Sequence, residues 1–484
     1  MPFSATSVPA SADSAVKGFY AVTIIAMPAI SKSAALEHAS VKGLVRELGL
    51  AQAASIVVGV VIGSGIFLVP AEMMRAAGSA KLVYLAWIVG GIFSFCGAVT
   101  YAELGAMKPQ AGGEYVYIRD AYGPLAGFLC GWTWTIVIKP ASLAAISTGI
   151  VQVLGSFSSL SFLTIDGTHL TRSGQIMAFG VVFLVSGINY VGVRRAGNFQ
   201  LVFTIFKIAL IIAISALAFT SHGTWEHFAG HYIAATGGIV GFILAVKAAL
   251  WAYDGWPDLN MVAEEVRDPE RNIPLALVGG LIAIGALYML VNAAVQYALP
   301  APELANSSSP MSDAVKIALG NGGAAMVAGA IIVSLITSLN GIAMSGARMA
   351  FAMSRDGNFF SSLAKVHPRF HTPHVAIAIQ GLLSVIFLLI GGNFQQLFTL
   401  ALFSEWLSYV TASSALFVFK TASSGSIRPG PFWRYPLAPA LFILASAPLL
   451  YYTFTSNLKN SALGSLVILA GVPVYYAFAL RRKV

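Results

Sequence analysis

The sequence predicts an all-α polytopic membrane protein with twelve transmembrane helices, arranged as a five-plus-five inverted repeat. Three observations support this prediction: charge is scarce, apolar runs are long, and two of the runs are broken. Of the 484 residues, 57% are hydrophobic and only 10% are charged, against roughly 25% in an average soluble domain. These proportions exclude an ordinary soluble enzyme. Apolar residues in unbroken runs, rather than in alternation, also argue against an outer-membrane β-barrel.

Twelve apolar runs follow one another after residue 50. A bilayer-spanning helix needs ~20 apolar residues, and the runs have about this length or more. Short polar segments separate them, as expected for loops between spans. The runs cover residues 51–74, 82–105, 122–155, 174–193, 197–219, 238–262, 275–299, 322–353, 375–392, 396–419, 435–455 and 461–480.

Two of these runs contain strong helix breakers near their middle. The first run has Gly63-Ser64-Gly65, and the sixth has Asp254-Gly255-Trp256-Pro257. Irregular backbone at membrane depth must be buried in protein or line a cavity, because unsatisfied backbone groups are costly in hydrocarbon. Glycine alone also serves close helix packing, but Asp, Gly and Pro within four residues need another explanation. Breaks five helices apart indicate two inverted repeats, each opened by a discontinuous helix.

This pattern predicts the organisation of the chain. We expect a disordered cytoplasmic leader over residues 1–46, although the sequence leaves open whether residues 1–26 are translated or needed. A membrane domain over 47–480 follows, and 481–484 form a short tail. Within the domain we expect repeat one at about 47–219, repeat two at about 238–419 and peripheral helices at about 433–480.

Lys and Arg residues predict the orientation in the membrane. A formal net charge of +9 would suggest nucleic acid in a soluble protein, but here 20 of the 28 basic residues fall in the leader and the even-numbered loops and tail. Only 5 fall on the other side. This positive-inside bias places both termini in the cytoplasm and removes the case for nucleic-acid binding. The remaining 3 lie within the apolar runs: Lys139, Lys207 and Lys247.

The two breaks predict a site for a small zwitterion. The unwound segment after Ile62 leaves backbone N–H groups at the start of a second half-helix near Ile66-Phe67, and such an N-terminus favours an anion. The second break should expose the carbonyl groups of Trp251 and Ala252, which suit an ammonium group. A carboxylate site beside an ammonium site describes an α-amino acid.

Several segments in order along the chain resemble the L-type amino acid transporter family of the amino acid–polyamine–organocation superfamily. The first-helix segment alone is weak evidence, but the ordered set is specific and covers nearly the whole chain beyond the leader. The segments are Val60-Val61-Ile62-Gly63-Ser64-Gly65-Ile66-Phe67, Tyr101-Ala102-Glu103-Leu104-Gly105, Gly112-Gly113-Glu114-Tyr115, Trp251-Ala252-Tyr253-Asp254-Gly255-Trp256, Ala263-Glu264-Glu265, Ser338-Leu339-Asn340-Gly341, Ser345-Gly346-Ala347-Arg348 and Ser354-Arg355-Asp356-Gly357.

The resemblance implies a LeuT-like fold, alternating access and a substrate held at the two breaks. It implies that the carbonyl groups of Ile62, Trp251 and Ala252 recognise the substrate ammonium group. It also implies that Trp251 closes over the occluded substrate, and Ser142 is expected to face the substrate side chain. No catalytic residue, metal ligand or cofactor is implied, and the chain is not expected to be an enzyme. The implied substrate-binding positions are Ile62, Gly63, Ser64, Gly65, Ile66, Trp251, Ala252, Tyr253, Asp254, Gly255 and Ser142.

Three charged residues in the spans are expected to govern coupling or specificity. In relatives a lysine at the position of Lys207 touches the broken first helix and the eighth helix, where sodium-coupled cousins hold a sodium ion. Asp254 suits either a cationic side chain, the α-ammonium group or free backbone N–H groups, and Lys247, seven residues earlier, could neutralise it. Glu405 is either a proton or side-chain site or a buried structural carboxylate. The sequence leaves these alternatives open.

Acidic residues at the expected cytoplasmic helix ends are interpreted as ion-pair partners. Glu103, Glu114, Glu264 and Glu265 are expected to pair with arginines drawn from Arg194, Arg195, Arg348 and Arg355.

The sequence thus predicts a sodium-independent exchanger of neutral, and potentially also cationic, L-amino acids in a bacterial inner membrane. A proton-coupled amino acid or polyamine importer and, more remotely, an amino acid-sensing receptor are the alternatives. Animal relatives join a heavy subunit through a cysteine between helices three and four. The corresponding segment, about 156–173, has none, so no disulfide-linked heavy subunit is expected.

Overall fold

The computed structural model describes residues 43–390, 394–422, 433–456 and 458–481. Residues Leu44–Val484 cluster into one compact unit, separate from Met1–Gly43. The predicted leader and the short C-terminal tail therefore lie almost entirely outside the described residues.

Within the described residues, nine helical segments are long and apolar enough to cross a membrane, and a bent helix pair supplies a tenth. The bent pair is α3 and α4, which meet at 43° across the first break. Helix α7 continues through a π-helical turn, η2, into α8. The elements are α3 (Leu50–Val61), α4 (Gly65–Ala77), α5 (Ala80–Met107), α7 (Pro124–Thr133), η2 (Trp134–Ile138), α8 (Lys139–Gly155), α9 (Arg172–Tyr190), α10 (Val193–Phe219), α13 (Pro269–Ala298), α16 (Asn321–Arg355), α18 (Phe394–Ala422), α19 (Ala438–Ser456) and α20 (Leu458–Arg481).

Two further apolar helices correspond to the sixth and ninth predicted spans. Helix α11 (Gly238–Ala252) has 15 residues and α17 (His374–Ile390) has 17. At 1.5 Å per residue they reach about 22 and 26 Å, short of the ~30 Å hydrocarbon core. The all-α polytopic fold class is confirmed, while the count of twelve spans depends on these two helices and stays a prediction.

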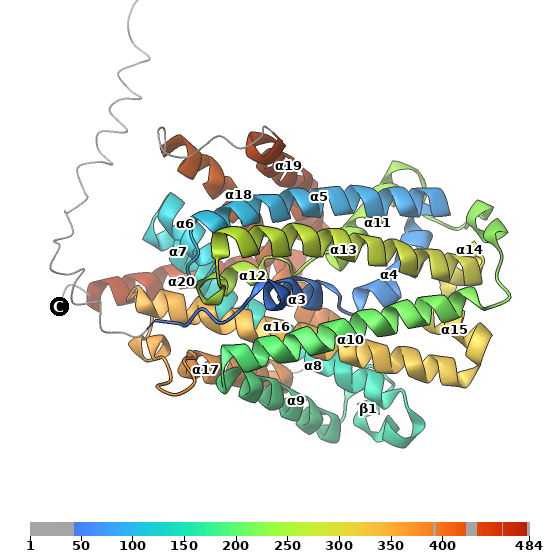
Figure 1. Ribbon diagram of the computed structural model, residues 1–484, viewed down its shortest axis with the longest axis horizontal. Helices are drawn as coiled ribbons and strands as arrows, with labels where there is room; N and C mark the ends of the chain where they lie inside the picture. The colour runs from blue at the N-terminus through green and yellow to red at the C-terminus, as the bar shows by residue number, and fades with distance from the viewer. Residues whose placement is uncertain (1–42, 391–393, 423–432, 457, 482–484) are drawn as a thin grey trace, which may run out of the picture. The chain divides into compact units, whose positions relative to one another are not determined.

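Four elements of the first half of the unit pack against elements of the second half. Helix α4 packs against α11, α5 against α13, α8 against α16 and α9 against α17. Each of these partners is the corresponding element five spans later, which agrees with the predicted inverted repeat. Figure 1 shows α5, α13 and α10 running side by side. Helix α19 packs outside this core on α5 and α18, and α20 packs on α7 and α18.

Glycine and proline fix several helix ends. Gly78 adopts a left-handed conformation with φ +77° and ends α4, the role that glycine commonly has after a helix. Pro124 and Pro269 stand at the first positions of α7 and α13, where the missing proline N–H costs nothing. Shorter elements complete the unit: α6 (Glu114–Tyr122), η3 (Ser158–Leu163), β1 (Thr164–Ile165), β2 (His169–Leu170), η4 (Trp225–Ala229), α12 (Asp258–Met261), η5 (Ala263–Glu265), α14 (Ala301–Asn306), α15 (Pro310–Leu319), η6 (Ser361–Ala364) and η7 (Trp433–Leu437).

Small residues bring α3 close to its neighbours. A Cβ atom on Gly59 would lie 2.2 Å from Nε2 of Gln200 on α10, and one on Gly341 would lie 2.2 Å from Cγ2 of Val60. Packing between membrane helices depends on such close approach, because lipid gives little hydrophobic drive for association. The first break is therefore held between α10 and α16.

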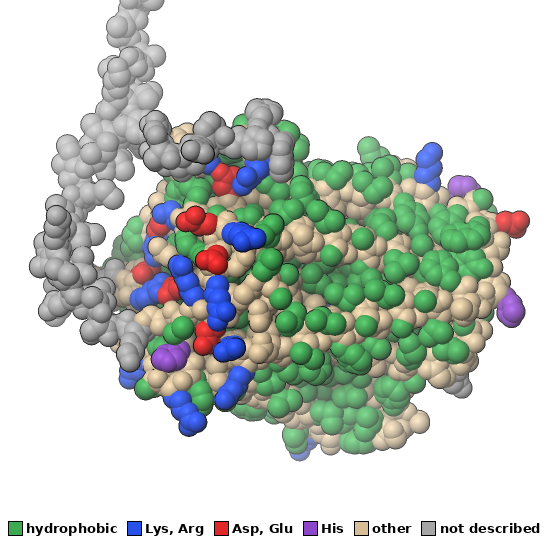
Figure 2. All heavy atoms as spheres, viewed as in Figure 1, with side chains coloured by type: hydrophobic (Ala, Val, Ile, Leu, Met, Phe, Trp, Pro, Cys, Tyr) green, Lys and Arg blue, Asp and Glu red, His purple; other side chains and the backbone are tan. Residues whose placement is uncertain are grey.

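Charged side chains gather at one end of the unit (Figure 2). Glu265 pairs with Arg348 at 2.7 Å, and Glu264 pairs with Arg355 at 2.8 Å. These two predicted ion pairs are confirmed. The arrangement agrees with the Lys and Arg bias that the sequence assigns to one side of the membrane.

The other predicted partners differ from the observed ones. Glu103 pairs with Lys420 on α18 rather than with an arginine. Glu114 is buried and has no Lys or Arg at ion-pair distance among the described residues. Periodicity along α5 and α6 gives the face of a side chain, but not which distant helix covers that face.

Candidate functional site

The first break exposes backbone donors at the start of α4. Helix α3 ends at Val61, and α4 begins at Gly65 with Ser64 as its N-cap. Among the described residues, no hydrogen-bond acceptor pairs with the backbone N–H groups of Ser64, Gly65 and Ile66. Together with the helix dipole, these donors form an anion-binding position. The half-helix begins one residue earlier than the sequence indicated.

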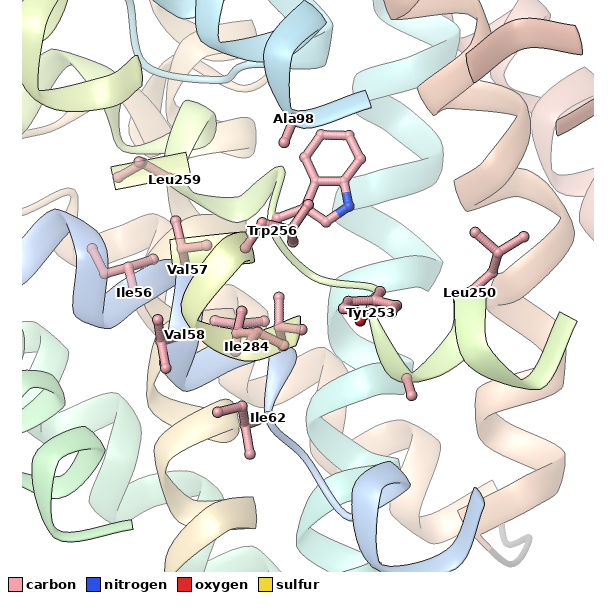
Figure 3. Packing of buried hydrophobic residues seen from close by; sticks show 14 of the residues in the cluster. Ile56, Val57, Val58, Ile62, Ala98, Leu250, Tyr253, Trp256, Leu259 and Ile284 are labelled. Atoms are coloured by element: carbon pink, nitrogen blue, oxygen red, sulfur yellow. The ribbon is translucent and has the colours of Figure 1, made fainter. Parts of the chain in front are cut away.

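The second break lies directly beside the first. Helix α11 ends at Ala252, and α12 begins only at Asp258. Gly255 adopts φ +109°, and a Cβ there would lie 2.7 Å from Cγ1 of Val60. A Cβ on Gly65 would lie 3.6 Å from Cα of Ala252. Figure 3 shows Ile62 directly after the end of α3, and the ribbon of α11 giving way to a thin segment near Tyr253.

A cavity of about 110 Å³ lies between the two breaks, α8, α16 and α18. Its wall brings together most of the predicted site residues. Backbone donors, an aromatic ring and carboxylates therefore face one small volume. The predicted residues in the wall are Gly63, Ser64, Gly65, Ser142, Trp251, Ala252, Asp254, Gly255 and Glu405.

Four predicted site residues are not in this wall. Lys207 is 1% exposed and lies behind the first break. Its ammonium nitrogen donates to the carbonyl oxygens of Gly59 at 2.8 Å and Ile62 at 2.6 Å, and lies 3.5 Å from that of Ser334. Lys207 therefore joins the end of α3 to α16, as the resemblance implies, without lining the cavity.

The carbonyl of Ile62 does not provide the expected ammonium site. Its oxygen accepts from Nζ of Lys207 at 2.6 Å and from Oγ of Ser334 at 2.7 Å. A carbonyl oxygen has two lone pairs, so these two donors satisfy it. In this arrangement the carbonyl oxygen of Ile62 therefore has no lone pair left for a substrate ammonium group. The carbonyl of Ala252 already accepts from the hydroxyl of Tyr288 at 2.7 Å and keeps one lone pair.

The side chain of Tyr253 also points elsewhere. It is 3% exposed, and its ring packs 5.7 Å from Trp87 and 5.2 Å from Tyr288, measured between centroids. Ile66 is fully buried in the core, so its possible contribution is its backbone N–H. The side chain of Tyr253 therefore lies outside the cavity, because the unwound chain turns it toward α5 and α13.

The cavity also contains an ion pair that the sequence reasoning missed. Nζ of Lys139 lies 2.5 Å from Oδ1 of Asp258, and the hydroxyl of Ser345 donates to Oδ2 of Asp258 at 2.8 Å. Both Lys139 and Asp258 line the cavity. The π-helical turn η2 ends directly before Lys139, and such turns often occur at functional sites. The sequence signal that could have revealed this ion pair is the presence of a lysine and an aspartate within apolar runs.

The cavity holds more acidic than basic side chains. Asp254, Asp258 and Glu405 face it with Lys139 as the one Lys or Arg in its wall. Oδ1 of Asp254 accepts from the N–H of Gly255 at 2.7 Å, and Oε1 of Glu405 accepts from the hydroxyl of Tyr409 at 2.9 Å. Because Lys139 is paired to Asp258, the carboxyl groups of Asp254 and Glu405 face the cavity without that lysine as a partner.

Lys247 does not neutralise Asp254. Its ammonium lies 4.7 Å from the ring centroid of Tyr452 on α19, and it is not in the cavity wall. The expected common face assumed a continuous helix from 247 to 254, but α11 ends at Ala252. The break therefore separates the directions of the two side chains.

The sequence matches the amino acid permease family over residues 48–479. It is 33% identical to the serine/threonine exchanger SteT of Bacillus subtilis over 450 residues, which is 92% of this chain and 99% of that protein. It is 31% identical to the human b(0,+)-type amino acid transporter 1, covering 92% of this chain and 91% of the relative. It is 28% identical to the mouse Asc-type amino acid transporter 1, covering 90% and 81% respectively.

Proposed function

The chain belongs to the amino acid permease family, and on this premise we propose that it is a sodium-independent exchanger of L-amino acids. Neutral amino acids form its principal substrate class and cationic amino acids a second one. The proposal rests above all on one observation: the unpaired N–H groups of Ser64, Gly65 and Ile66 open beside the end of α11. The relatives named for serine/threonine exchange and for amino acid transport support the same class.

The proposed binding mode assigns each part of an amino acid to one element. The α-carboxylate accepts from the donors at the start of α4, where the helix dipole stabilises it. The α-ammonium lies at the end of α11, near the carbonyls of Trp251 and Ala252. The side chain extends toward Ser142 and Asp254, which line the same cavity. Correct placement of all three parts lets the half-helices close over the substrate.

Sodium independence is supported by the position of Lys207. The carbonyl oxygens of Gly59 and Ile62 would suit a hard cation such as sodium, but both accept from the ammonium of Lys207. A lysine ammonium and a sodium ion at one point would repel each other. The fixed charge of Lys207 therefore takes the place that a coupling ion would need.

Alternating access follows in this proposal from movement of the half-helices at the two breaks. Trp251 lines the cavity at the end of α11 and closes over the substrate. The ion pairs Glu265–Arg348 and Glu264–Arg355 close the charged end and must separate when that end opens. We place this end in the cytoplasm with both termini, in a bacterial inner membrane, because it gathers the Lys and Arg side chains.

In this proposal the protein functions without a disulfide-linked partner. Its two cysteines, Cys96 and Cys130, are both buried and unpaired. Cys96 lies in α5 and Cys130 in α7, away from the loop that precedes α9. The expected partners are an amino acid and the lipid bilayer, and nothing in the proposed cycle requires a cofactor or nucleic acid.

Counterflow in proteoliposomes tests exchange. Purified protein is reconstituted with labelled serine inside, and unlabelled serine, arginine or buffer is added outside. An exchanger releases label only when an external substrate is present. Equal release into buffer would contradict obligatory exchange, accumulation that follows an imposed pH gradient would favour the proton-coupled importer, and saturable binding without release would favour a receptor.

A bulky residue at the first break tests the site. Ser64→Trp should abolish serine-dependent stabilisation and lower counterflow at least about tenfold, because the indole fills the space beside the donors. Leu68→Trp on the same half-helix is the matched control, because Leu68 is 37% exposed on the outside of α4. Intact binding by Ser64→Trp protein would overturn the proposed site.

A further inference from the structure

A second hollow opens on the membrane-facing side of the unit, between α5, α11 and α19. It is a crevice of about 490 Å³, lined by apolar side chains that include Phe93, Phe242 and Leu444. Its volume lies within the ~300–1,000 Å³ of typical ligand pockets. Leu444 is 68% exposed, so the crevice opens toward the hydrocarbon of the bilayer. Its occupant must therefore be largely apolar.

Of the described residues in the wall of this crevice, Lys247 is the one that carries a charge. Its ammonium lies over the ring of Tyr452, and among the described residues no carboxylate pairs with it. A lysine in a membrane span is costly unless it pairs, and it usually marks a functional contact. The aromatic ring supplies a weak partner but leaves the positive charge without an anion.

The crevice is polar at one end and apolar along its length. Tyr452 lies four residues before Ser456, the last residue of α19, so the ring is about 6 Å from that end of the helix. The side chain of Lys247 leans toward the start of α11, the same end, because helical side chains tilt toward the N-terminus. From Tyr452 the wall continues to Leu441, about 16 Å along α19. A cation near the mouth of a long apolar groove fits an anionic amphiphile.

We propose that this crevice binds an anionic membrane lipid, with its phosphate on Lys247 and one acyl chain along α19. The bound lipid also contacts the gating element of the protein. Leu250 lines the crevice, whereas the adjacent Trp251 lines the central cavity. One half-helix therefore has the lipid on one side and the substrate on the other.

Native mass spectrometry of the full chain tests the lipid site. Protein in detergent is mixed with phosphatidylglycerol or with phosphatidylcholine of the same acyl chains, and the retained lipid is counted. The wild type should favour phosphatidylglycerol. Lys247→Gln should reduce that preference about fivefold, which is the effect expected when one lysine is lost from an anionic membrane surface. Lys247→Arg should keep it. Lys316→Gln, an exposed cation on α15, is the matched control.

A second variant tests the apolar part of the crevice. Leu444→Trp should lower the retention of both lipids, because the indole fills the groove at a position that is 68% exposed. Gel filtration shows whether each variant remains folded. Equal preference in wild-type and Lys247→Gln protein would overturn the headgroup site, and unchanged retention by Leu444→Trp would overturn the chain site.

Discussion

The ammonium nitrogen of Lys207 lies 2.6 Å from the carbonyl oxygen of Ile62, the residue that directly follows the first half-helix. The hydroxyl of Ser334 donates to the same oxygen at 2.7 Å. One carbonyl thus joins α10, α16 and the end of α3. This contact satisfies backbone that would otherwise be costly in a membrane, and it ties the position of the first break to two further helices.

Lys207→Ala should uncouple these helices. It leaves the carbonyl of Gly59 without its charged donor, and a hydrogen bond to a charged group contributes about 1.5–3 kcal/mol. We expect lower thermal stability and at least about tenfold slower counterflow. Wild-type counterflow should be equal in sodium and in choline buffer. A requirement for sodium in the wild type would contradict the proposed role of Lys207.

Asp254→Asn should separate cationic from neutral substrates. Asparagine keeps the acceptor for the N–H of Gly255 but loses the negative charge. We expect arginine affinity to fall about tenfold, equivalent to about 1.4 kcal/mol, with serine affinity nearly unchanged. Thermal-shift titrations of both amino acids measure this difference. If arginine stabilises wild-type and Asp254→Asn protein equally, Asp254 does not select the side chain.

The Glu265–Arg348 and Glu264–Arg355 pairs should differ sharply in their effect on stability. Both side chains of the first pair are 0% exposed, whereas those of the second are 30% and 19% exposed. Removing one partner of a buried pair costs about 3–5 kcal/mol, and an exposed pair contributes about 0–1 kcal/mol. Arg348→Met should therefore destabilise the protein far more than Arg355→Met, as measured by thermal unfolding of the purified protein in detergent. Similar losses of stability in the two variants would show that burial does not decide the cost of removing the arginine.

Gly341→Ala should disturb the packing around the first break. A Cβ at Gly341 would lie 2.2 Å from Cγ2 of Val60, whereas a Cβ at Gly329 on the same helix meets open space. Overpacking costs about 1–3 kcal/mol, so Gly341→Ala should lower thermal stability and counterflow. Gly329→Ala is the control and should be neutral or stabilising. Equal behaviour of the two variants would contradict close packing of α16 on α3.

The sequence by itself determined the membrane class, most of the spans and the two breaks. A bilayer requires long apolar helices with satisfied backbone, and Gly, Asp and Pro at mid-depth violate that pattern visibly. The same reasoning located Ser64 and Gly65 at a helix start. These features are local, because each depends on residues that are neighbours in the chain.

Only the tertiary structure decided which distant side chains meet. Lys139 pairs with Asp258, a residue 119 positions away, and neither periodicity nor composition identifies that partner. The expected common face of Lys247 and Asp254 was wrong because α11 ends at Ala252, and beyond a break helical spacing no longer gives direction. Contacts between packed helices and the turn of an unwound segment depend on the whole fold, which is why the sequence predicted the site's backbone better than its side chains.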